Sequence, residues 1–413
     1  MGEALRHSAS DQNHLRAIMA TQSKDIVIIG GGVVGSATAY WLAQAPGLDG
    51  RRVTVVEKDP TYAVSSTPRS AGGVRQQFST PENIALSKLT LDILRDLKPY
   101  FGPEASLPFR EHGYLILAPE EGANILASNV EIQRANGGDI VLLDPKELAA
   151  RFSWLNTEGV ACGSFGQSGE GWVDPVLLHA LFRNAARDKG VTFLKDEVTG
   201  LEVDGPAVTS VSLASGTRIP CGAVVNAAGF AAGAVSKLAG IELPVEPRKR
   251  YIFVIDRRDS PEELHKAPLT VDTSGVFFRP EGRMFITGIS PEEENEPPAV
   301  DLDAINYEEF EEIVWPNLAT RVPLFETAKV VNAWAGYYDY NTLDQNAIIG
   351  AHPQLTNFYF ANGFSGHGLQ QAAAAGRAVT ELIMTGRFQT IDLTRFGYER
   401  IAAGQPLLET NII

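Results

Sequence analysis

Hydrophobic residues fall in short runs along the chain, and the first run is followed by a glycine-rich turn. This run, Ile26–Ile29, precedes residues 36–44, whose apolar positions have helical spacing. A second run, Val53–Val56, ends at Glu57. Because four consecutive apolar residues are typical of a strand buried on both faces, the pattern predicts a strand–turn–helix–strand unit in a parallel sheet.

Later runs predict the remaining elements. Helical spacing indicates longer helices over residues 81–97, 121–136, 175–189 and 369–385. Apolar or alternating runs indicate strands over residues 113–118, 190–194, 222–229, 250–256, 275–279 and 284–288, and a last strand with its glycine-rich turn over 358–368. Short segments at 198–203, 208–213 and 217–220, separated by Asp-Gly and Ser-Gly pairs, predict an antiparallel meander. Residues 290–303 are acidic and proline-rich, which predicts a solvent loop.

Three glycines separate the first strand from its helix. Gly30, Gly32 and Gly35 have the spacing G-x-G-x-x-G, which lets the backbone turn tightly, approach a pyrophosphate and pack the helix on the sheet. The phosphates would lie at the helix N-terminus, where backbone N–H groups and the helix dipole favour negative charge. Glu57 ends the next strand, where an acid binds a ribose hydroxyl. The sequence therefore predicts a dinucleotide site; a glycine-rich turn without a nucleotide is the alternative.

Composition and charge narrow the class of protein. The net charge of −15 argues against a nucleic-acid surface and against docking on anionic lipid. Cys162 and Cys221 each stand alone in an apolar setting, so we expect no disulfide framework and a reducing, cytoplasmic compartment. The histidines are dispersed without ligand spacing, so we expect no metal site.

Two segments could be mistaken for targeting or membrane segments. Residues 26–48 carry no charge and are long enough to resemble a membrane span, but their glycines and strand–turn–helix pattern fit the nucleotide site better, so no transmembrane segment is expected. Residues 1–22 are polar and lack an apolar signal core, which predicts an N-terminal extension. Arg6 and Arg16 leave a mitochondrial presequence open, although acidic Glu3 and Asp11 oppose it.

Several motifs together resemble the family of amino-acid-oxidising flavoproteins, which includes D-amino-acid oxidase, glycine oxidase, monomeric sarcosine oxidase and the sarcosine and dimethylglycine dehydrogenases. The motifs are Glu57, SSTPRSAGGVRQQF at 65–78, VNAAG at 225–229 and GFSGHG at 363–368. Further segments are similar to the sarcosine dehydrogenase-like branch, which includes a mitochondrial FAD-dependent oxidoreductase-domain protein linked to complex I assembly. They are LPVEPRKRY at 243–251, FRPEG at 278–282 and ETNII at 409–413. The resemblance runs from about residue 23 to the C-terminus.

The resemblance implies an α/β + β fold of the glutathione-reductase and D-amino-acid-oxidase type, in which a Rossmann-like FAD-binding domain carries an inserted antiparallel-sheet substrate domain. Nucleotide signals at both ends and in the middle of the chain make both domains discontinuous. We expect the FAD-binding domain to comprise residues 23–105, 170–243 and 340–413. We expect the substrate domain to comprise residues 106–169 and 244–339.

The resemblance also implies FAD bound noncovalently. Tyr337 stands where sarcosine oxidase has the cysteine that carries covalent flavin, and Arg69 stands where dimethylglycine dehydrogenase-like proteins have the attachment histidine. The helix after Gly368 would direct its N-terminal dipole at the flavin pyrimidine edge and stabilise negative charge there. The residues expected to hold FAD are Gly30, Gly32, Val33, Val34, Gly35, Glu57, Lys58, Ser66, Thr67, Ala71, Gly72, Val198, Ala227, Ala228, Gly229, Gly363, Gly366, His367, Gly368, Leu369 and Gln370.

Four residues are expected at the substrate. Arg75 matches the arginine that pairs with the substrate carboxylate in sarcosine oxidase-like enzymes, and a planar guanidinium suits that bidentate contact; a structural ion pair or a cofactor contact is the alternative. Gln370 replaces a lysine that helps to hold the carboxylate there, and His367 would contact the flavin without acid–base work. Arg279 would be a second cation for a substrate with two carboxylates, while Arg248–Arg250 can instead pair with surface acids.

The resemblance implies an FAD-dependent amine oxidoreductase whose substrate is a small secondary amino acid, either sarcosine-like or an N-carboxymethyl amine such as iminodiacetate. The C–N bond would be oxidised to an imine, which hydrolyses to an amine and an aldehyde or 2-oxo acid. Oxygen or an electron carrier would accept the electrons, and Ile286 at the place of an oxygen-activating lysine disfavours fast use of oxygen. The alternatives are a dehydrogenase that reduces quinone or an electron-transfer flavoprotein, and a flavoprotein assembly or scaffold factor without amino-acid turnover. No oligomeric state follows from the sequence.

Overall fold

The computed structural model describes residues 25–291 and 296–410, so the extension expected at 1–22 lies outside the described residues. A six-stranded sheet has the order β19-β20-β13-β1-β2-β9, and all of its neighbouring strands are parallel except β19 and β20. Its strands are β1 (Ile26–Ile29), β2 (Val53–Glu57), β9 (Thr192–Lys195), β13 (Ala223–Asn226), β19 (Ile348–Ala351) and β20 (Phe358–Asn362). The predicted parallel strand–turn–helix–strand unit is therefore confirmed.

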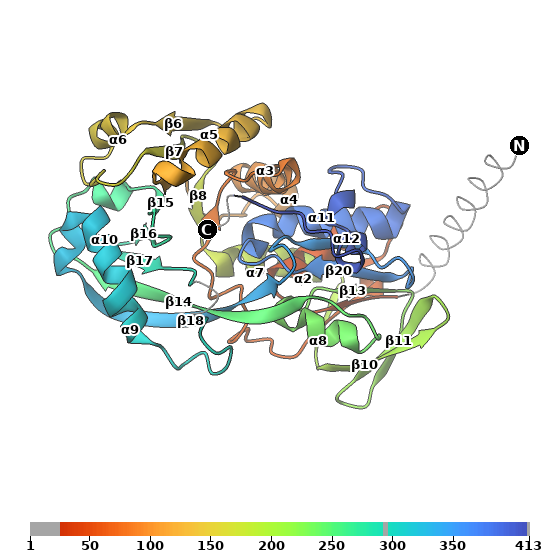
Figure 1. Cartoon of the computed structure of the whole chain (residues 1–413). Helices are drawn as coiled ribbons and strands as arrows, with labels where there is room; N and C mark the ends of the chain where they lie inside the picture. Colours follow the sequence, from red (N-terminus) through yellow and green to blue (C-terminus); the bar gives the residue numbers. More distant parts are fainter. Residues whose placement is uncertain (1–24, 292–295, 411–413) are drawn as a thin grey trace, which may run out of the picture.

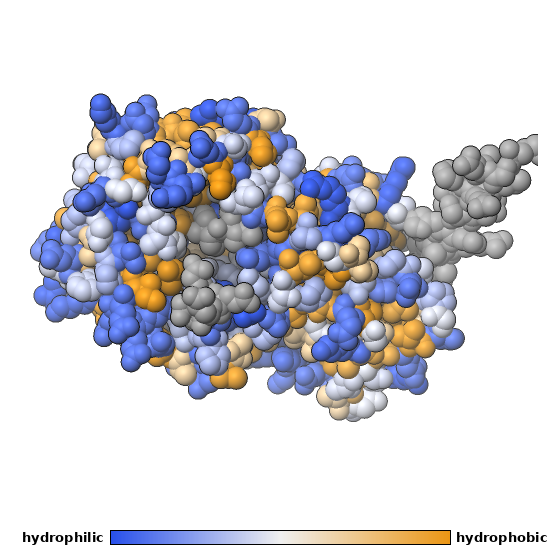
Figure 2. Space-filling view, in the orientation of Figure 1, coloured by the Kyte–Doolittle hydropathy of each residue, from blue (hydrophilic) through white to orange (hydrophobic). Residues whose placement is uncertain are grey.

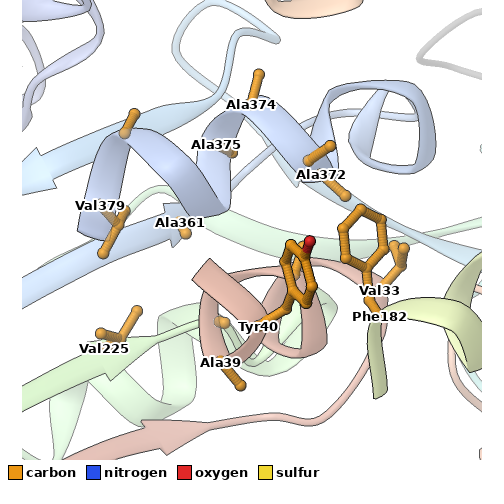
Figure 3. Close-up of a cluster of buried hydrophobic side chains, with 14 of the residues drawn as sticks. Val33, Ala39, Tyr40, Phe182, Val225, Ala361, Ala372, Ala374, Ala375 and Val379 are labelled. Atoms are coloured by element: carbon orange, nitrogen blue, oxygen red, sulfur yellow. The ribbon is translucent and has the colours of Figure 1, made fainter. Parts of the chain in front are cut away.

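Small side chains let two helices pack closely on this sheet. Helix α11 (Gly368–Thr385) lies against α2 (Val33–Gln44), and alanines of α11 belong to the same buried hydrophobic cluster as Ala39 and Tyr40 of α2 (Figure 3). Helix α7 (Pro175–Asp188) adds Phe182 to the cluster, with its ring 5.5 Å from that of Tyr40. Helix α3 (Pro81–Arg95) packs on the other side of α11. This packing holds the N-termini of α2 and α11 close enough together to line one cavity.

Two three-stranded sheets flank the main sheet. The meander predicted between residues 198 and 220 is confirmed as antiparallel strands β10 (Val198–Asp204), β11 (Ala207–Leu213) and β12 (Arg218–Pro220). The second small sheet has the order β3-β8-β4 and contains β3 (Gly73–Val74), β4 (Phe109–Arg110) and β8 (Gly171–Val173). Strand β3 leads directly into Arg75, so this sheet sets where that side chain begins.

An eight-stranded sheet forms the other half of the molecule, in the order β18-β14-β17-β16-β15-β5-β7-β6. Its long strands β14 and β18 run along the lower side of the molecule toward the six-stranded sheet (Figure 1). The sheet is mixed rather than purely antiparallel, because β15 and β5 are parallel. Its strands are β5 (Tyr114–Ala118), β6 (Ile140–Leu143), β7 (Cys162–Gly166), β14 (Val245–Asp256), β15 (Leu269–Val271), β16 (Phe277–Glu281), β17 (Met284–Gly288) and β18 (Lys329–Asn341).

Helices cover this second sheet. Helix α5 (Glu120–Ala135) and helix α6 (Pro145–Arg151) pack on β5, β6 and β7. A continuous helical segment comprises α9 (Tyr307–Glu309), a π-helical turn (Phe310–Val314) and α10 (Trp315–Arg321), and its Phe310 and Val314 join the core beneath β14 and β17. Hydrophilic residues cover much of the face seen in Figure 2, and hydrophobic ones form only small patches there. Within the described residues, no helix is both long and apolar enough to cross a bilayer.

Candidate active site

A cavity lies at the carboxyl ends of β1, β2 and β13 and continues onto one face of the eight-stranded sheet. Open α/β sheets bind ligands at this edge. At one end the cavity is lined by the turn between β1 and α2, and at the other by residues of β14, β15, β16 and β18. The loop 62–75 and the turn before α11 lie between these ends and line it too.

The first end of the cavity has the groups that a dinucleotide requires. Gly32, Val33 and Val34 line it at the N-terminus of α2, where the Val33 N–H donates to Thr67 Oγ1 over 3.1 Å. The Glu57 carboxylate accepts the Gly31 N–H on Oε2 and the Asp59 N–H on Oε1, each over 2.8 Å. Each carboxylate oxygen keeps a second lone pair, so Glu57 is held in place and can still accept ribose hydroxyls.

A second helix N-terminus meets the same cavity. Gly368, Leu369 and Gln370 begin α11 and line the wall, and no side chain caps the helix at His367. The positive end of an 18-residue helix dipole therefore points at this part of the cavity. A group that becomes negative on reduction, such as the flavin pyrimidine ring, fits this place.

Most of the residues expected to hold FAD line the cavity, and the exceptions among the described residues are Gly35, Gly72 and Gly363. Gly35 lies in the first turn of α2, where a Cβ would overlap the carbonyl oxygen of Gly30. Gly72 has a φ of +77° and lies against the backbone of Val173. Both glycines thus act through close packing of the backbone around the site rather than by contact with a ligand.

Arg75 is a buried cation in the wall of the cavity, with 2% of its surface exposed. Its Nη2 lies 3.0 Å from Nε2 of His367, and its Cζ lies 4.6 Å from the centroid of the Phe78 ring. The Arg75 backbone N–H donates to Oε1 of Gln370 over 2.8 Å. Gln370 therefore orients the loop that carries Arg75, in addition to lining the cavity.

His367 is neutral in this site. A guanidinium can only donate, so His367 Nε2 accepts from Arg75 and the imidazole proton is on Nδ1. Burial, and then the positive charge of Arg75, lower the pKa of His367 to about 3. The ring also packs edge-on against Phe78, with the centroids 5.1 Å apart. The imidazole thus anchors the guanidinium and also lines the cavity, where the sequence predicts a contact with the flavin.

Arg279 differs from its expected role. Among the described residues, it is not part of the cavity wall. Its guanidinium donates to the carbonyl oxygens of Ala71 and Pro280 and to Glu281 Oε2. Its Cζ also lies 5.2 Å from the centroid of the Trp172 ring. Through these contacts Arg279 holds the loop at Ala71, beside the cofactor cavity. A direct contact between Arg279 and a second substrate carboxylate does not fit this arrangement.

Sequence reasoning missed several side chains of the site. Tyr114, Arg250 and Tyr338 line the end of the cavity formed by the eight-stranded sheet, and burial raises the pKa of Tyr114 to about 12, so its phenol stays protonated. Glu170 is fully buried behind Arg75 and accepts the Gln76 N–H over 2.6 Å. The signal for Arg250 was the basic run at 248–250 on a predicted strand, and the signal for Glu170 was an acid between two glycines.

Tyr337 and Arg69, which stand where related flavoproteins attach the flavin covalently, contact other parts of the chain. Tyr337 lines the cavity with its ring 4.7 Å from that of Phe230, and Arg69 donates to the carbonyl oxygens of Ala63 and Ala335. Cys162 and Cys221 are both buried outside the wall of the cavity. Among the described residues, no cluster of three or more His, Cys, Asp or Glu could hold a metal ion.

A dinucleotide site that opens onto a pocket with a buried arginine is consistent with an oxidoreductase, and the family of the chain identifies the dinucleotide as FAD. The chain belongs to the DAO family of FAD dependent oxidoreductases, which matches residues 25–382, and FAD is the cofactor of this family. It is 43% identical to FAD-dependent oxidoreductase domain-containing protein 1 of Bos taurus, over 98% of this chain and 89% of the relative. This confirms the predicted family, fold class and cofactor.

Two more distant similarities concern proteins with named substrates. Mitochondrial dimethylglycine dehydrogenase of Homo sapiens is 27% identical over 91% of this chain and 45% of that protein. The crystal structure of L-proline dehydrogenase from P. horikoshii matches with a TM-score of 0.81 and 28% identity, over 92% of this chain and 98% of that one. Over 92% of its length, the chain therefore shares its fold with that L-proline dehydrogenase.

Proposed function

We propose that this protein oxidises the C–N bond of a small secondary amino acid, sarcosine-like or an N-carboxymethyl amine such as iminodiacetate. The observation that carries the proposal is Arg75, a buried guanidinium held beside the N-terminus of α11 in the cofactor cavity. A carboxylate is the ligand that such a planar, preorganised cation recognises best. The names of the proline and dimethylglycine dehydrogenases, which denote small N-substituted amino acids, support this substrate class.

The chain's own residues would bind and orient the substrate. Arg75 would bind the carboxylate, and His367 and Gln370 would hold Arg75 in position. We call the end of the cavity formed by the eight-stranded sheet the substrate end. Tyr114, Phe277 and Tyr337 line it with aromatic surface, which excludes water and favours an uncharged amine. When bound, FAD supplies the two-electron acceptor that takes a hydride from the carbon next to the amine nitrogen. Water then hydrolyses the resulting imine to an amine and an aldehyde or 2-oxo acid.

We further propose that an electron carrier, such as a quinone or an electron-transfer flavoprotein, accepts the electrons more rapidly than oxygen does. Ile286 occupies β17 with 1% of its surface exposed and packs with Ile252 of the cavity wall. Lys58, at the nucleotide end, is the only lysine among the described residues of that wall. Within the described part of the wall, no ammonium group therefore lies near the end formed by the eight-stranded sheet, where it could stabilise the negative charge that builds up when oxygen is reduced.

The test of carboxylate recognition uses the variant Arg75→Lys and an inert ligand. (Methylthio)acetate has sulfur in place of the sarcosine nitrogen, so it cannot form an imine, and its binding is measured from the change in the visible flavin spectrum. Loss of the bidentate contact should weaken binding roughly 10- to 100-fold while FAD stays bound.

Arg321→Lys is the matched control, because Arg321 of α10 is also buried and ion-paired but is not part of the cavity wall. Its affinity for (methylthio)acetate should equal that of the wild type. Equal affinity in the Arg75 variant would mean that the carboxylate binds elsewhere.

A further inference from the structure

A second arginine lines the same cavity as Arg75. Arg250 lies on β14 with 7% of its surface exposed, and its Cζ is 5.3 Å from the centroid of the Tyr338 ring. Burial raises the pKa of the Tyr338 phenol, and the charges of both Arg250 and Arg75 oppose that rise. Both guanidinium groups therefore lie near one phenol, at the substrate end of the cavity.

An acidic side chain already occupies the fork of Arg250. Nη1 lies 2.6 Å from Oε2 of Glu296, and Nη2 lies 2.7 Å from Oε1. The two side chains are 8% and 11% exposed, so water screens this bidentate pair little. The buried Nε of Arg250 has no hydrogen-bond partner among the described residues.

A second carboxyl group lies within electrostatic range of Arg250. Glu309 of α9 is 9% exposed, and its buried Oε1 has no hydrogen-bond partner within the described part of the chain. Burial raises the pKa of Glu309 to about 7; Arg250 opposes this rise and Glu296 adds to it. Arg250 thus interacts with Glu296 directly and with Glu309 through its charge, and a ligand carboxylate there would be a third carboxyl group.

We propose that Glu296 masks Arg250, so that the pocket selects an amino acid with a single carboxylate and rejects a substrate with two. This inference rests on the proposed binding of the first carboxylate to Arg75. The charge of Arg250 is neutralised in its bidentate pair, so a second carboxylate meets repulsion from Glu296 rather than attraction. Within the proposed substrate class, this favours sarcosine or proline over iminodiacetate. Removal of the masking acids should open the pocket to diacids.

The experiment compares two inert ligands that differ by one carboxylate. (Methylthio)acetate and thiodiacetate are the sulfur analogues of sarcosine and iminodiacetate, and flavin difference spectra give both dissociation constants on the FAD-loaded protein. The wild type should bind the monoacid more tightly. In Glu296→Gln/Glu309→Gln, the preference should shift toward the diacid roughly 10- to 100-fold, because a charge-assisted hydrogen bond is gained. Glu296→Gln alone should show a smaller shift in the same direction, since Glu309 can then approach Arg250.

Two further variants show that the shift belongs to this site. Glu281→Gln removes the acid partner of another buried arginine, Arg279, outside the cavity wall, and should leave the preference unchanged. Adding Arg250→Gln to the double variant should abolish the shift. An unchanged preference in the single and double variants, or a wild type that prefers the diacid, would overturn this inference alone. Failure of both ligands to bind the FAD-loaded wild type would overturn the proposed function together with it.

Discussion

The Nη2 atom of Arg75 lies 3.0 Å from Nε2 of His367, and this contact joins the loop after β3 to the N-terminus of α11. Segments almost 300 residues apart in sequence are thereby fixed around one cavity. The contact requires a neutral imidazole. In a protonated ring Nε2 would carry a hydrogen, so two N–H donors would point at each other and two positive charges would lie side by side. The protonation state of His367 is thus part of the architecture of the site.

His367 should make the folded protein less stable in acid. Burial and Arg75 lower its pKa from 6.5 to about 3, so between these values the unfolded chain binds a proton that the folded one does not. The contribution of His367 to stability is present above about pH 6.5 and is lost as pH falls toward 3. In His367→Asn, the free energy of unfolding should depend less steeply on pH between about 4 and 6. Chemical denaturation at a series of pH values measures this slope, and an identical slope would show that His367 titrates normally.

Glu170 should make the folded protein less stable as the pH rises. Burial raises its pKa to about 8, although Gln77, Gln76 and Arg75 oppose the rise, so the folded state keeps a proton that the unfolded chain loses near pH 4.5. Its contribution to stability is complete below about pH 4.5 and is lost as pH rises through about 8. Glu170→Gln cannot titrate, so its unfolding free energy should fall less than that of the wild type between about pH 5 and 8. The same denaturation series tests this, and parallel curves would contradict the assignment.

Gly35→Ala should abolish FAD binding. A Cβ there would overlap the Gly30 carbonyl oxygen, which forces α2 away from the strand and removes its N-terminus from the phosphates. Gly122→Ala in α5 is the matched control, since its Cβ would meet Pro119 and Ala118 at ordinary contact distances of 3.4 and 3.5 Å. That control should gain about 0.5–1 kcal/mol from helix propensity and keep its FAD. Flavin content after purification and thermal unfolding distinguish the two, and normal FAD content in Gly35→Ala would be the contrary result.

The nucleotide end of the site was predictable because its signals are local. Buried strands appear as continuous apolar runs, and the spacing of Gly30, Gly32 and Gly35 encodes a backbone path that needs no distant partner. Helix α2 still begins at Val33 rather than at 36, because the glycine turn merges into its first turn. Strand β18 was missed because it lies at the edge of its sheet, where exposed polar residues interrupt the alternation.

The substrate end was not predictable in the same way. Arg279 and Arg250 both lie in predicted strands, and the sequence favoured Arg279 as the second cation. In the fold, Arg279 pairs with Glu281, two residues away, and turns to the loop at Ala71, while Arg250 lines the cavity and pairs with Glu296, 46 residues away. Which acid pairs with which arginine depends on strand register and on the loops between strands, and local spacing in the sequence predicts neither of them.

Anaerobic reduction of the flavin tests the central claim most directly. The FAD-loaded protein would be mixed without oxygen with sarcosine, proline, dimethylglycine, glycine, D-alanine or iminodiacetate, and the visible flavin band followed in time. Rapid bleaching by a monocarboxylic secondary amino acid, slower in Arg75→Lys, is the predicted result, and an added dye should then restore the band faster than air does. Absence of bleaching by every compound, with FAD confirmed in the protein, would contradict amino-acid oxidation and favour a flavoprotein that acts in assembly.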